Sequence, residues 1–202
     1  MTGVNDGPVA VANTIAVLEN GAIDLGAASS VLGDDADVDG DALTVSSIRT
    51  GNVAATNGAQ GEIGSTLVGA YGVLTLNADG QYSYATTASA VDGLAAGATA
   101  VDVFTYTITD GALSASAELL ITVTGVNDAP VAVTNTDAVV EDGEIELVVD
   151  KSLLLNDADV DDAALSVSGI RTGSLSDAGS IGSVGAPFRG TYGTLTVNAN
   201  GS

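Results

Sequence analysis

Residues 34–41 are the most acidic stretch of the chain and read Asp-Asp-Ala-Asp-Val-Asp-Gly-Asp. Carboxylates at alternate positions around a glycine turn can converge on one cation, and calcium accepts about six to eight oxygen ligands. Clustered carboxylates also repel one another unless a cation neutralises them. The spacing therefore predicts a calcium site with ligands drawn from Asp35, Asp37, Asp39 and Asp41.

Two other interpretations of this loop must be weighed against the calcium site. Asp and Gly favour turns without any ligand, so the loop could simply be a solvated turn. Five carboxylates within eight residues of a chain with net charge −22 favour the metal site instead. The loop also begins like an EF-hand, but Ser46 stands where that motif needs its last glutamate. We therefore exclude the EF-hand.

The composition limits the classes of function. The chain has 26 acidic and four basic residues, a balance that repels nucleic acid and anionic lipid and attracts cations. It contains no histidine and no cysteine, so Ser-His and Cys-His catalysis and the usual zinc ligands are excluded. It has no apolar run of about 18 residues. We expect a protein that is not an enzyme, has no nucleic-acid partner and does not insert directly into a membrane.

An internal repeat determines the expected domain organisation. Residues 4–10, Val-Asn-Asp-Gly-Pro-Val-Ala, return 122 positions later as Val-Asn-Asp-Ala-Pro-Val-Ala. A repeat of this length predicts two homologous domains in tandem. We place a complete domain at residues 1–125 and the first part of a second at residues 126–202. The second copy ends at the counterpart of Gln81, so we expect it to be truncated and to expose unpaired strand edges.

The acidic loop is part of this repeat. Its second copy contains Asp157, Asp159 and Asp161, which we predict as a second set of calcium ligands. Asp162 replaces the glycine of the first loop and Ala163 replaces Asp41. The second site should therefore be weaker or differently shaped.

Alternating apolar residues predict strands rather than helices. The clearest are 101–109 and 114–124, joined by an Asp-Gly hairpin turn. A second hairpin is expected around the Asn-Ala-Asp-Gly turn at residues 77–80. Other expected elements are short strands at 9–18, 22–26 and 42–49, a long loop at 51–69 and one turn of helix within 91–98. The pattern predicts an all-β, antiparallel β-sandwich.

Four motifs occur together in this order: Glu19-Asn20-Gly21, the Asp-x-Asp-x-Asp loop, Thr109-Asp110-Gly111 and the Asn-Asp-x-Pro junction at 127–130. The combination resembles the cadherin-like and VCBS-type tandem repeats of large bacterial adhesins of the RTX type, many of them exported by type I secretion. The resemblance implies tandem immunoglobulin/cadherin-like β-sandwiches, here with the second incomplete. It also implies calcium ions, Ca2+, held near the junctions between successive domains.

The resemblance assigns ligands position by position. At the junction between the two copies they would be Asn127, Asp128 and Glu141, with Asp110, or Asp157 and Asp159, as further candidates. At the N-terminal end the matching half-set would be Asn5, Asp6 and Glu19.

The function that we expect is a calcium-stiffened spacer or adhesion repeat of a large secreted protein at the bacterial cell surface, with a part in biofilm formation. Its partners would be the neighbouring repeats of the same polypeptide. One alternative is a module that binds cell-surface or matrix glycans through loops 51–70 or 174–190, with Tyr71 as an aromatic contact. Another is a spacer attached to a secreted enzyme.

Overall fold

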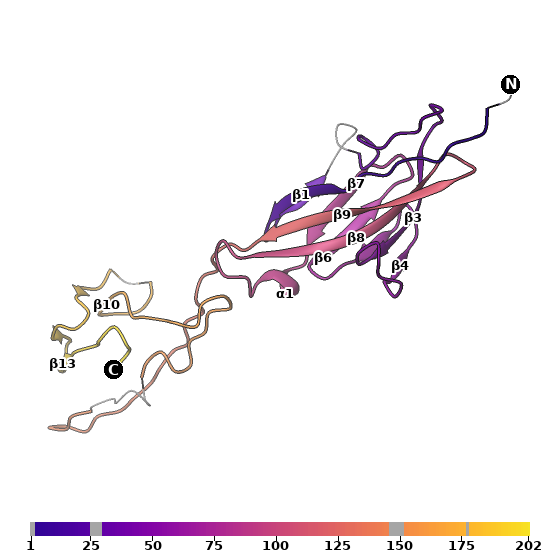
Figure 1. The fold of residues 1–202 in the computed structure, drawn as a ribbon. Helices are drawn as coiled ribbons and strands as arrows, with labels where there is room; N and C mark the ends of the chain where they lie inside the picture. The colour runs from indigo at the N-terminus through magenta and orange to yellow at the C-terminus, as the bar shows by residue number, and fades with distance from the viewer. Residues whose placement is uncertain (1–2, 25–29, 146–151, 177) are drawn as a thin grey trace. The chain divides into compact units, whose positions relative to one another are not determined.

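The computed structural model describes residues 3–24, 30–145, 152–176 and 178–202 (Figure 1). The chain divides into two compact units, residues 1–127 and 128–202, two residues beyond the boundary expected from the repeat. Regular structure in the described ranges is strand apart from one short helix, α1 (Ala88–Val91). The all-β class predicted from the alternation is confirmed. Among these residues no helix has the length and apolar character required to cross a membrane.

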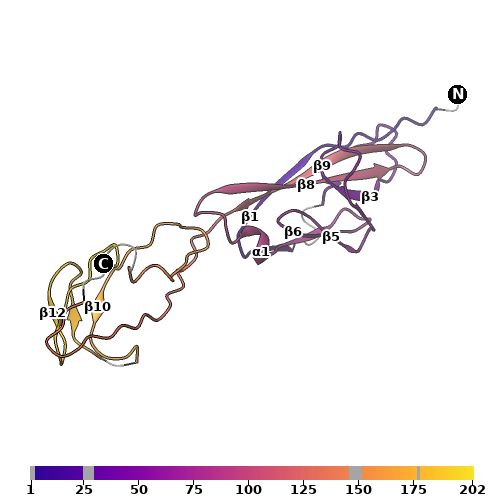
Figure 2. The ribbon, with the colours of Figure 1, turned by 90° about the horizontal axis from the view of Figure 1, so that it is seen from below.

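The first unit is a β-sandwich of two sheets (Figure 2). One sheet has the order β1 (Asn13–Leu18), β9 (Ser114–Thr124), β8 (Thr99–Thr109), β3 (Thr44–Thr50) and β4 (Gln60–Gly61). The other has the order β2 (Ala22–Asp24), β7 (Tyr82–Thr86), β6 (Gly72–Leu76) and β5 (Thr66–Val68).

Among the described strands the pairing is antiparallel as predicted, with one exception. β1 and β9 run parallel, with Leu18 opposite Thr124. A parallel pair needs a long connection, and almost the whole repeat lies between these two strands. The C-terminal ends of β1 and β9 therefore meet at the same end of the sheet.

Some expected elements lie elsewhere. The segment 51–69 is not one long loop, because β4 and β5 form there and extend both sheets. The helical turn lies at Ala88–Val91 and not within 91–98. β1 begins at Asn13, while Val9 makes only an isolated bridge to Ala36. Of the strand expected at 22–26, the last two residues lie outside the described ranges.

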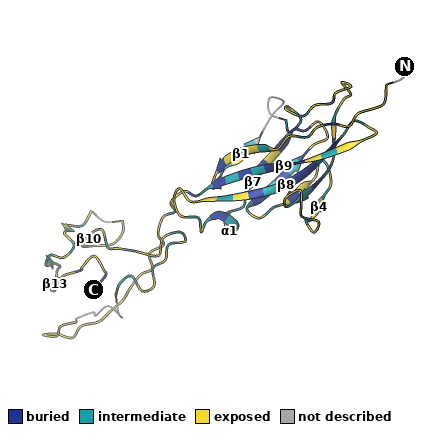
Figure 3. Ribbon diagram, viewed as in Figure 1, coloured by how far each residue is buried: buried dark blue, intermediate teal, exposed yellow. Residues whose placement is uncertain are grey.

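The core lies between the sheets and is built from the inward faces of the long strands (Figure 3). Phe104, Tyr106 and Ile108 of β8 are fully buried, as the period-two pattern predicts. The ring of Tyr84 in β7 meets that of Phe104 edge to face, with centroids 6.4 Å apart. Aromatic pairs in this arrangement add about 0.5–1.5 kcal/mol beyond the area they bury.

Asp102 is a charged residue on the inward face of β8 and is only 3% exposed. Its Oδ1 accepts a hydrogen bond from the amide of Ala70 at 2.9 Å, and its Oδ2 accepts one from the amide of Tyr71 at 3.0 Å. The hydroxyl of Tyr84 donates a third, also at 3.0 Å. The carboxylate therefore fastens β8 of one sheet to β7 and to the turn before β6 in the other.

The second unit contains two short strand pairs. β10 (Ile170–Arg171) pairs with β11 (Ile181–Gly182), and β12 (Phe188–Arg189) pairs with β13 (Thr194–Leu195). Its turns repeat those of the first unit, because Asp142 has the positive φ of Asn20. Many of its apolar side chains are exposed: Leu195 is 55% exposed, whereas its counterpart Leu74 is fully buried.

Candidate metal centres

The first acidic group, which we call the loop group, consists of Asp37, Asp39 and Asp41. One carboxylate oxygen from each lies within 4.8 Å of the others. The Oδ1 atom of Asp37 accepts hydrogen bonds from the amides of Asp39 and Asp41, at 2.9 and 3.4 Å, which wraps the backbone around this side chain. Its Oδ2 atom is buried without a hydrogen bond, so a cation could be bound there without displacing a protein donor.

The segment that enters the first unit lies against this loop. The amide of Asp6 donates to Oδ2 of Asp39 at 2.7 Å, and the side-chain amide of Asn5 donates to Oδ2 of Asp110 at 2.9 Å. Hydrogen bonds from the amide of Leu113, then from Ala112 and from the Asn5 side chain, lower the pKa of Asp110. Asn5, Asp6 and Asp110 therefore lie at the same end of the unit as the loop group.

Asp35 differs from its acidic neighbours because it turns inward. Its Oδ1 accepts a 2.7 Å hydrogen bond from the amide of Val11, and the hydroxyl of Tyr106 lies 3.4 Å from its Oδ2. Burial raises the pKa of this carboxyl. The second copy repeats the contact, since Oδ1 of Asp157 accepts a 2.7 Å hydrogen bond from the amide of Val133. Asp35 and Asp157 thus fix the segment that enters each unit to the acidic loop of that unit.

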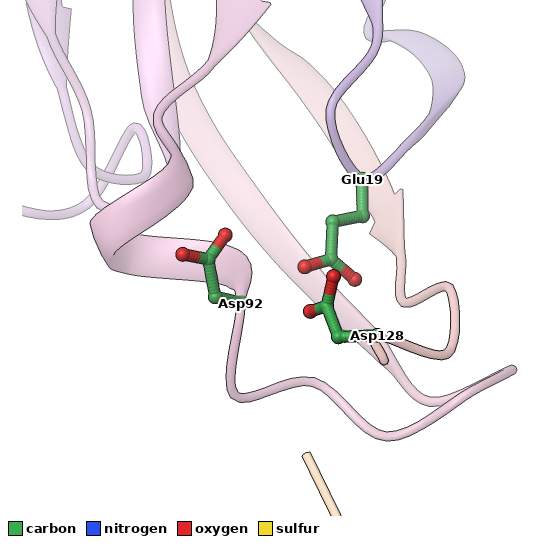
Figure 4. A group of neighbouring side chains, drawn as sticks. All are labelled: Glu19, Asp92 and Asp128. Atoms are coloured by element: carbon green, nitrogen blue, oxygen red, sulfur yellow. The ribbon is translucent and has the colours of Figure 1, made fainter. Parts of the chain in front are cut away.

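The second acidic group, which we call the Glu19 group, consists of Glu19, Asp92 and Asp128 (Figure 4). One carboxylate oxygen from each lies within 4.8 Å of the others. Glu19 directly follows β1, Asp92 directly follows α1, and Asp128 comes shortly after the end of β9. In the picture the carboxylates of Glu19 and Asp128 point toward one another.

Glu19 is held in place by the sequence around it. Its amide donates to the carbonyl of Thr124 at 2.8 Å, which continues the ladder between β1 and β9. Asn20 then adopts a positive φ of 59°, a conformation that Asn tolerates. A Cβ on Gly21 would lie 2.6 Å from the carbonyl oxygen of Leu18, so only glycine fits there. The Glu-Asn-Gly motif is thus a tight turn that fixes the position of the glutamate.

The Glu19 side chain is 4% exposed, yet its hydrogen bonding is incomplete. Oε2 accepts a 2.8 Å hydrogen bond from the amide of Val126, whereas Oε1 is buried without a partner. An ionised carboxylate buried in this way costs several kcal/mol unless a counter-charge is present. A cation at Oε1 would supply that counter-charge.

The acidic loop of the second unit also contains a buried carboxylate oxygen without a hydrogen bond. The interaction between the side chains of Asp159 and Asp161 raises the pKa of Asp161 and lowers that of Asp159. The Oδ1 atom of Asp161 is buried without a hydrogen bond. A backbone hydrogen bond from Asp128 also reaches Asp161, as that of Asp6 reaches Asp39.

The structure groups the expected ligands differently from the sequence. It brings Glu19 together with Asp128 and not with Asp6. It places Asp110 beside Asn5 and away from the junction between the copies. Asn127 is exposed next to Asp128, and Glu141 is exposed in a turn and belongs to neither acidic group of the described residues.

Asp92 was missed by the sequence analysis. The expected ligands came from the spacing of carboxylates and from the motifs that carry the family resemblance, and Asp92 belongs to neither pattern. Only the structure places it directly after the short helix α1.

Both groups have the chemistry of a calcium site. All donors are carboxylates, and oxygen ligands of this kind suit hard cations such as calcium better than they suit soft metals. Calcium binds oxygen at about 2.3–2.6 Å, so two ligands on opposite sides of one ion are about 5 Å apart. Oxygens within 4.8 Å of one another can therefore surround a single ion.

The family model for the bacterial cadherin-like domain matches residues 5–125, and the chain belongs to this family. Comparison with curated proteins gave no match. One similar solved structure is the endo-fucoidan hydrolase MfFcnA4 from glycoside hydrolase family 107, at 23% identity and a TM-score of 0.31. A substituted form of the same enzyme matches at 24% identity and a TM-score of 0.30. Each alignment covers 65% of this chain and 17% of the other chain.

Proposed function

We propose that this chain is a calcium-stabilised spacer or adhesion repeat of a larger extracellular protein, and that it is not an enzyme. Membership of the bacterial cadherin-like family supports the spacer or adhesion role. The absence of histidine and cysteine from the sequence supports a non-catalytic role.

The observation that carries the calcium proposal is the buried Oε1 atom of Glu19, which has no hydrogen bond. Asp92 and Asp128 add two further carboxylates to the same place. Three negative charges this close repel one another strongly, and one divalent ion reverses the sign of that interaction.

Bound calcium would cross-link three segments of the chain at the end of the first unit. It would connect the turn after β1, the end of α1 and the segment after β9, which come from distant parts of the sequence. If free calcium is about ten times Kd, the ion adds about 1.4 kcal/mol to the free energy of unfolding. Extracellular modules bind calcium with Kd values of about 0.1–1 mM, so such sites fill outside the cell and stay empty in the cytosol.

The proposed partners are neighbouring repeats of the same polypeptide. The two copies share the Asn-Asp-x-Pro motif at their starts, and in each copy the amide of its Asp bonds the acidic loop of that copy. Asp128 also belongs to the Glu19 group. Calcium at Asp128 would therefore restrict the chain where one repeat continues into the next.

The test is calcium titration of the whole chain by isothermal titration calorimetry, together with thermal unfolding in calcium and in chelator. We expect saturable binding and a higher Tm in calcium. Magnesium at the same concentration should stabilise less, because it demands a tighter octahedral geometry. No heat of binding and an unchanged Tm would refute the proposal.

The glycan-binding alternative gains no support from Tyr71. Its side chain is partly buried against the hydrophobic core, and its amide is bound to Asp102. Tyr71 therefore has a packing role, and we propose no second function.

A further inference from the structure

Three Asn-Gly pairs occur in the sequence, at Asn20-Gly21, Asn57-Gly58 and Asn200-Gly201. In such a pair the backbone nitrogen of the glycine can attack the side-chain carbonyl carbon of the asparagine, because glycine has no Cβ to hinder the approach. All three asparagines are exposed to solvent. Exposure therefore does not distinguish the pairs, and the local backbone decides which of them reacts.

Two of the pairs lie in turns that hinder this attack. The amide of Gly21 donates a 2.9 Å hydrogen bond to the carbonyl of Leu18, and Asn20 has a positive φ of 59°. The amide of Gly201 donates a 2.9 Å hydrogen bond to the carbonyl of Asn198. In both pairs the glycine nitrogen must lose a turn hydrogen bond before it can attack.

The pair Asn57-Gly58 has no such restraint. The amide of Gly58 donates no hydrogen bond to any described residue, and the side chain of Asn57 forms none with these residues either. Asn57 is also absent from the described non-glycine residues that have a positive φ. The nitrogen of Gly58 and the side chain of Asn57 are therefore free to meet.

The chain next to this pair is held closely against β3. The amide of Thr50 donates to the carbonyl of Ala59 at 3.0 Å, and the amide of Ala59 donates to Oγ1 of Thr50 at 2.9 Å. A Cβ on Gly58 would lie 1.8 Å from the carbonyl oxygen of Thr50, so only glycine fits there. These contacts lead directly into the pairing of β3 with β4. A longer backbone before Gly58 would disturb that pairing.

The second copy keeps the glycine but not the asparagine. A Cβ on Gly179 would lie 1.6 Å from the carbonyl oxygen of Thr172, the counterpart of Thr50. The residue before this glycine is Ala178. The close approach explains the glycine in both copies, whereas alanine is accepted at the position before it.

We propose that Asn57-Gly58 is a self-modification site that converts to isoaspartate in the folded chain. The nitrogen of Gly58 bonds to Cγ of Asn57 and gives its proton to solvent, while the side-chain nitrogen takes up a proton and leaves as ammonia. Water then opens the succinimide ring that has formed. Cleavage at the backbone carbonyl of Asn57 gives isoaspartate, whose main chain runs through Cβ and Cγ, and cleavage at Cγ gives aspartate.

The isoaspartate product adds a methylene group to the main chain immediately before the close contact of Gly58. The two hydrogen bonds between Thr50 and Ala59 cannot keep their geometry when the chain beside them is lengthened. β4, which covers one edge of the five-stranded sheet, then separates from β3. This inference is independent of calcium binding.

The experiment incubates the whole folded chain at mildly basic pH, where the amide nitrogen reacts faster. Peptide mass spectrometry with electron-transfer fragmentation follows each pair and distinguishes isoaspartate from aspartate. Asn57 should convert at least about tenfold faster than Asn20 and Asn200, because their glycine nitrogens must first break hydrogen bonds. In urea the turns are lost, and the three rates should converge. Asn57→Ala should fold normally and lack the fast reaction, since alanine stands at this place in the second copy.

Hydrogen exchange tests the structural consequence on modified chain separated by ion exchange. The amides of Thr50 and Ala59 should exchange at least about tenfold faster in the isoaspartyl chain than in the natural chain. Asn57→Asp is the matched control, because it adds the charge without lengthening the main chain, and it should exchange like the natural chain. Equal rates for the three pairs in the folded chain, or an order of rates that persists in urea, would overturn the proposal. Unchanged exchange in the isoaspartyl chain would overturn the separation of β4.

Discussion

The Oε2 atom of Glu19 accepts a 2.8 Å hydrogen bond from the backbone amide of Val126. This contact joins the residue after β1 to the segment after β9, and it is possible because the two strands run parallel and end together. The remaining oxygen, Oε1, is buried without a hydrogen bond and lies within reach of two other carboxylates. Glu19 is therefore both a structural acceptor and the centre of the proposed calcium site.

Glu19→Gln should separate these two roles. The Gln carbonyl can still accept from Val126, but the negative charge is lost. We expect calcium affinity to fall at least about tenfold, because affinity depends on the number of charged ligands. In chelator the variant should be as stable as the natural chain or more so, because a buried unpaired charge has been removed. Calorimetric titration and thermal unfolding measure both effects.

Glu62→Gln is the matched control for this substitution. Glu62 is exposed in the same unit and belongs to neither acidic group of the described residues. It should leave calcium binding unchanged. If Glu19→Gln bound calcium as tightly as the control, the Glu19 group would not be the site.

The sandwich could be predicted from the sequence because its long strands have strong local signals. Residues 101–109 and 114–124 alternate apolar and polar side chains, and the Asp-Gly turn between them sets their pairing. The parallel pairing of β1 with β9 could not be predicted this way, since nothing local in residues 13–18 specifies a partner so distant in the sequence.

The candidate sites were predictable in residue type but not in grouping. The alternate carboxylates of residues 35–41 correctly marked an acidic loop, yet the structure turns Asp35 inward and the others toward one another. Glu19 and Asp128 are brought together by tertiary pairing of strands, which spacing in the sequence does not encode. Asp92 joins them from a third segment for the same reason.

Asp92→Asn is the second prediction. An Asn side chain keeps the shape of Asp but donates one ligand oxygen without charge. We expect calcium affinity at the Glu19 group to fall about threefold to tenfold, less than for Glu19→Gln, because Asp92 is less buried. Calorimetric titration compares the two variants directly.

Asp79→Asn serves as its control. Asp79 lies in the turn between β6 and β7, where its Oδ1 accepts a hydrogen bond from the amide of Gln81 that Asn can also accept. An equal loss of calcium affinity in both variants would show that general charge reduction, and not ligation by Asp92, was responsible.

Asp35→Asn is expected to show a pH-dependent effect on stability. Burial raises the pKa of Asp35 above its ordinary value of 3.8, so the folded state disfavours the ionised form. The stabilisation from the protonated carboxyl is complete below that ordinary value and is lost as pH rises through the raised pKa. Asn does not titrate and can still accept from Val11. The free energy of unfolding of the variant, relative to the natural chain, should therefore increase between about pH 3 and pH 7.

Urea unfolding in chelator at both pH values measures this difference without interference from bound ions. Asp34→Asn is the neighbouring comparison, because Asp34 is exposed beside the inward-facing carboxyl. A relative stability of Asp35→Asn that stays constant or declines with rising pH would contradict the assignment of Asp35 to a buried structural role.

Asp102→Ala should destabilise the first unit far more than Tyr84→Phe. The alanine would leave the amides of Ala70 and Tyr71 and the hydroxyl of Tyr84 without an acceptor in a buried place. Loss of a buried charged acceptor of this kind costs about 3–5 kcal/mol. Tyr84→Phe removes one donor and leaves the carboxylate bound to two amides, so it should cost about 1 kcal/mol. Urea unfolding followed by circular dichroism in chelator gives both values, and equal costs would show that the two sheets are not fastened through Asp102.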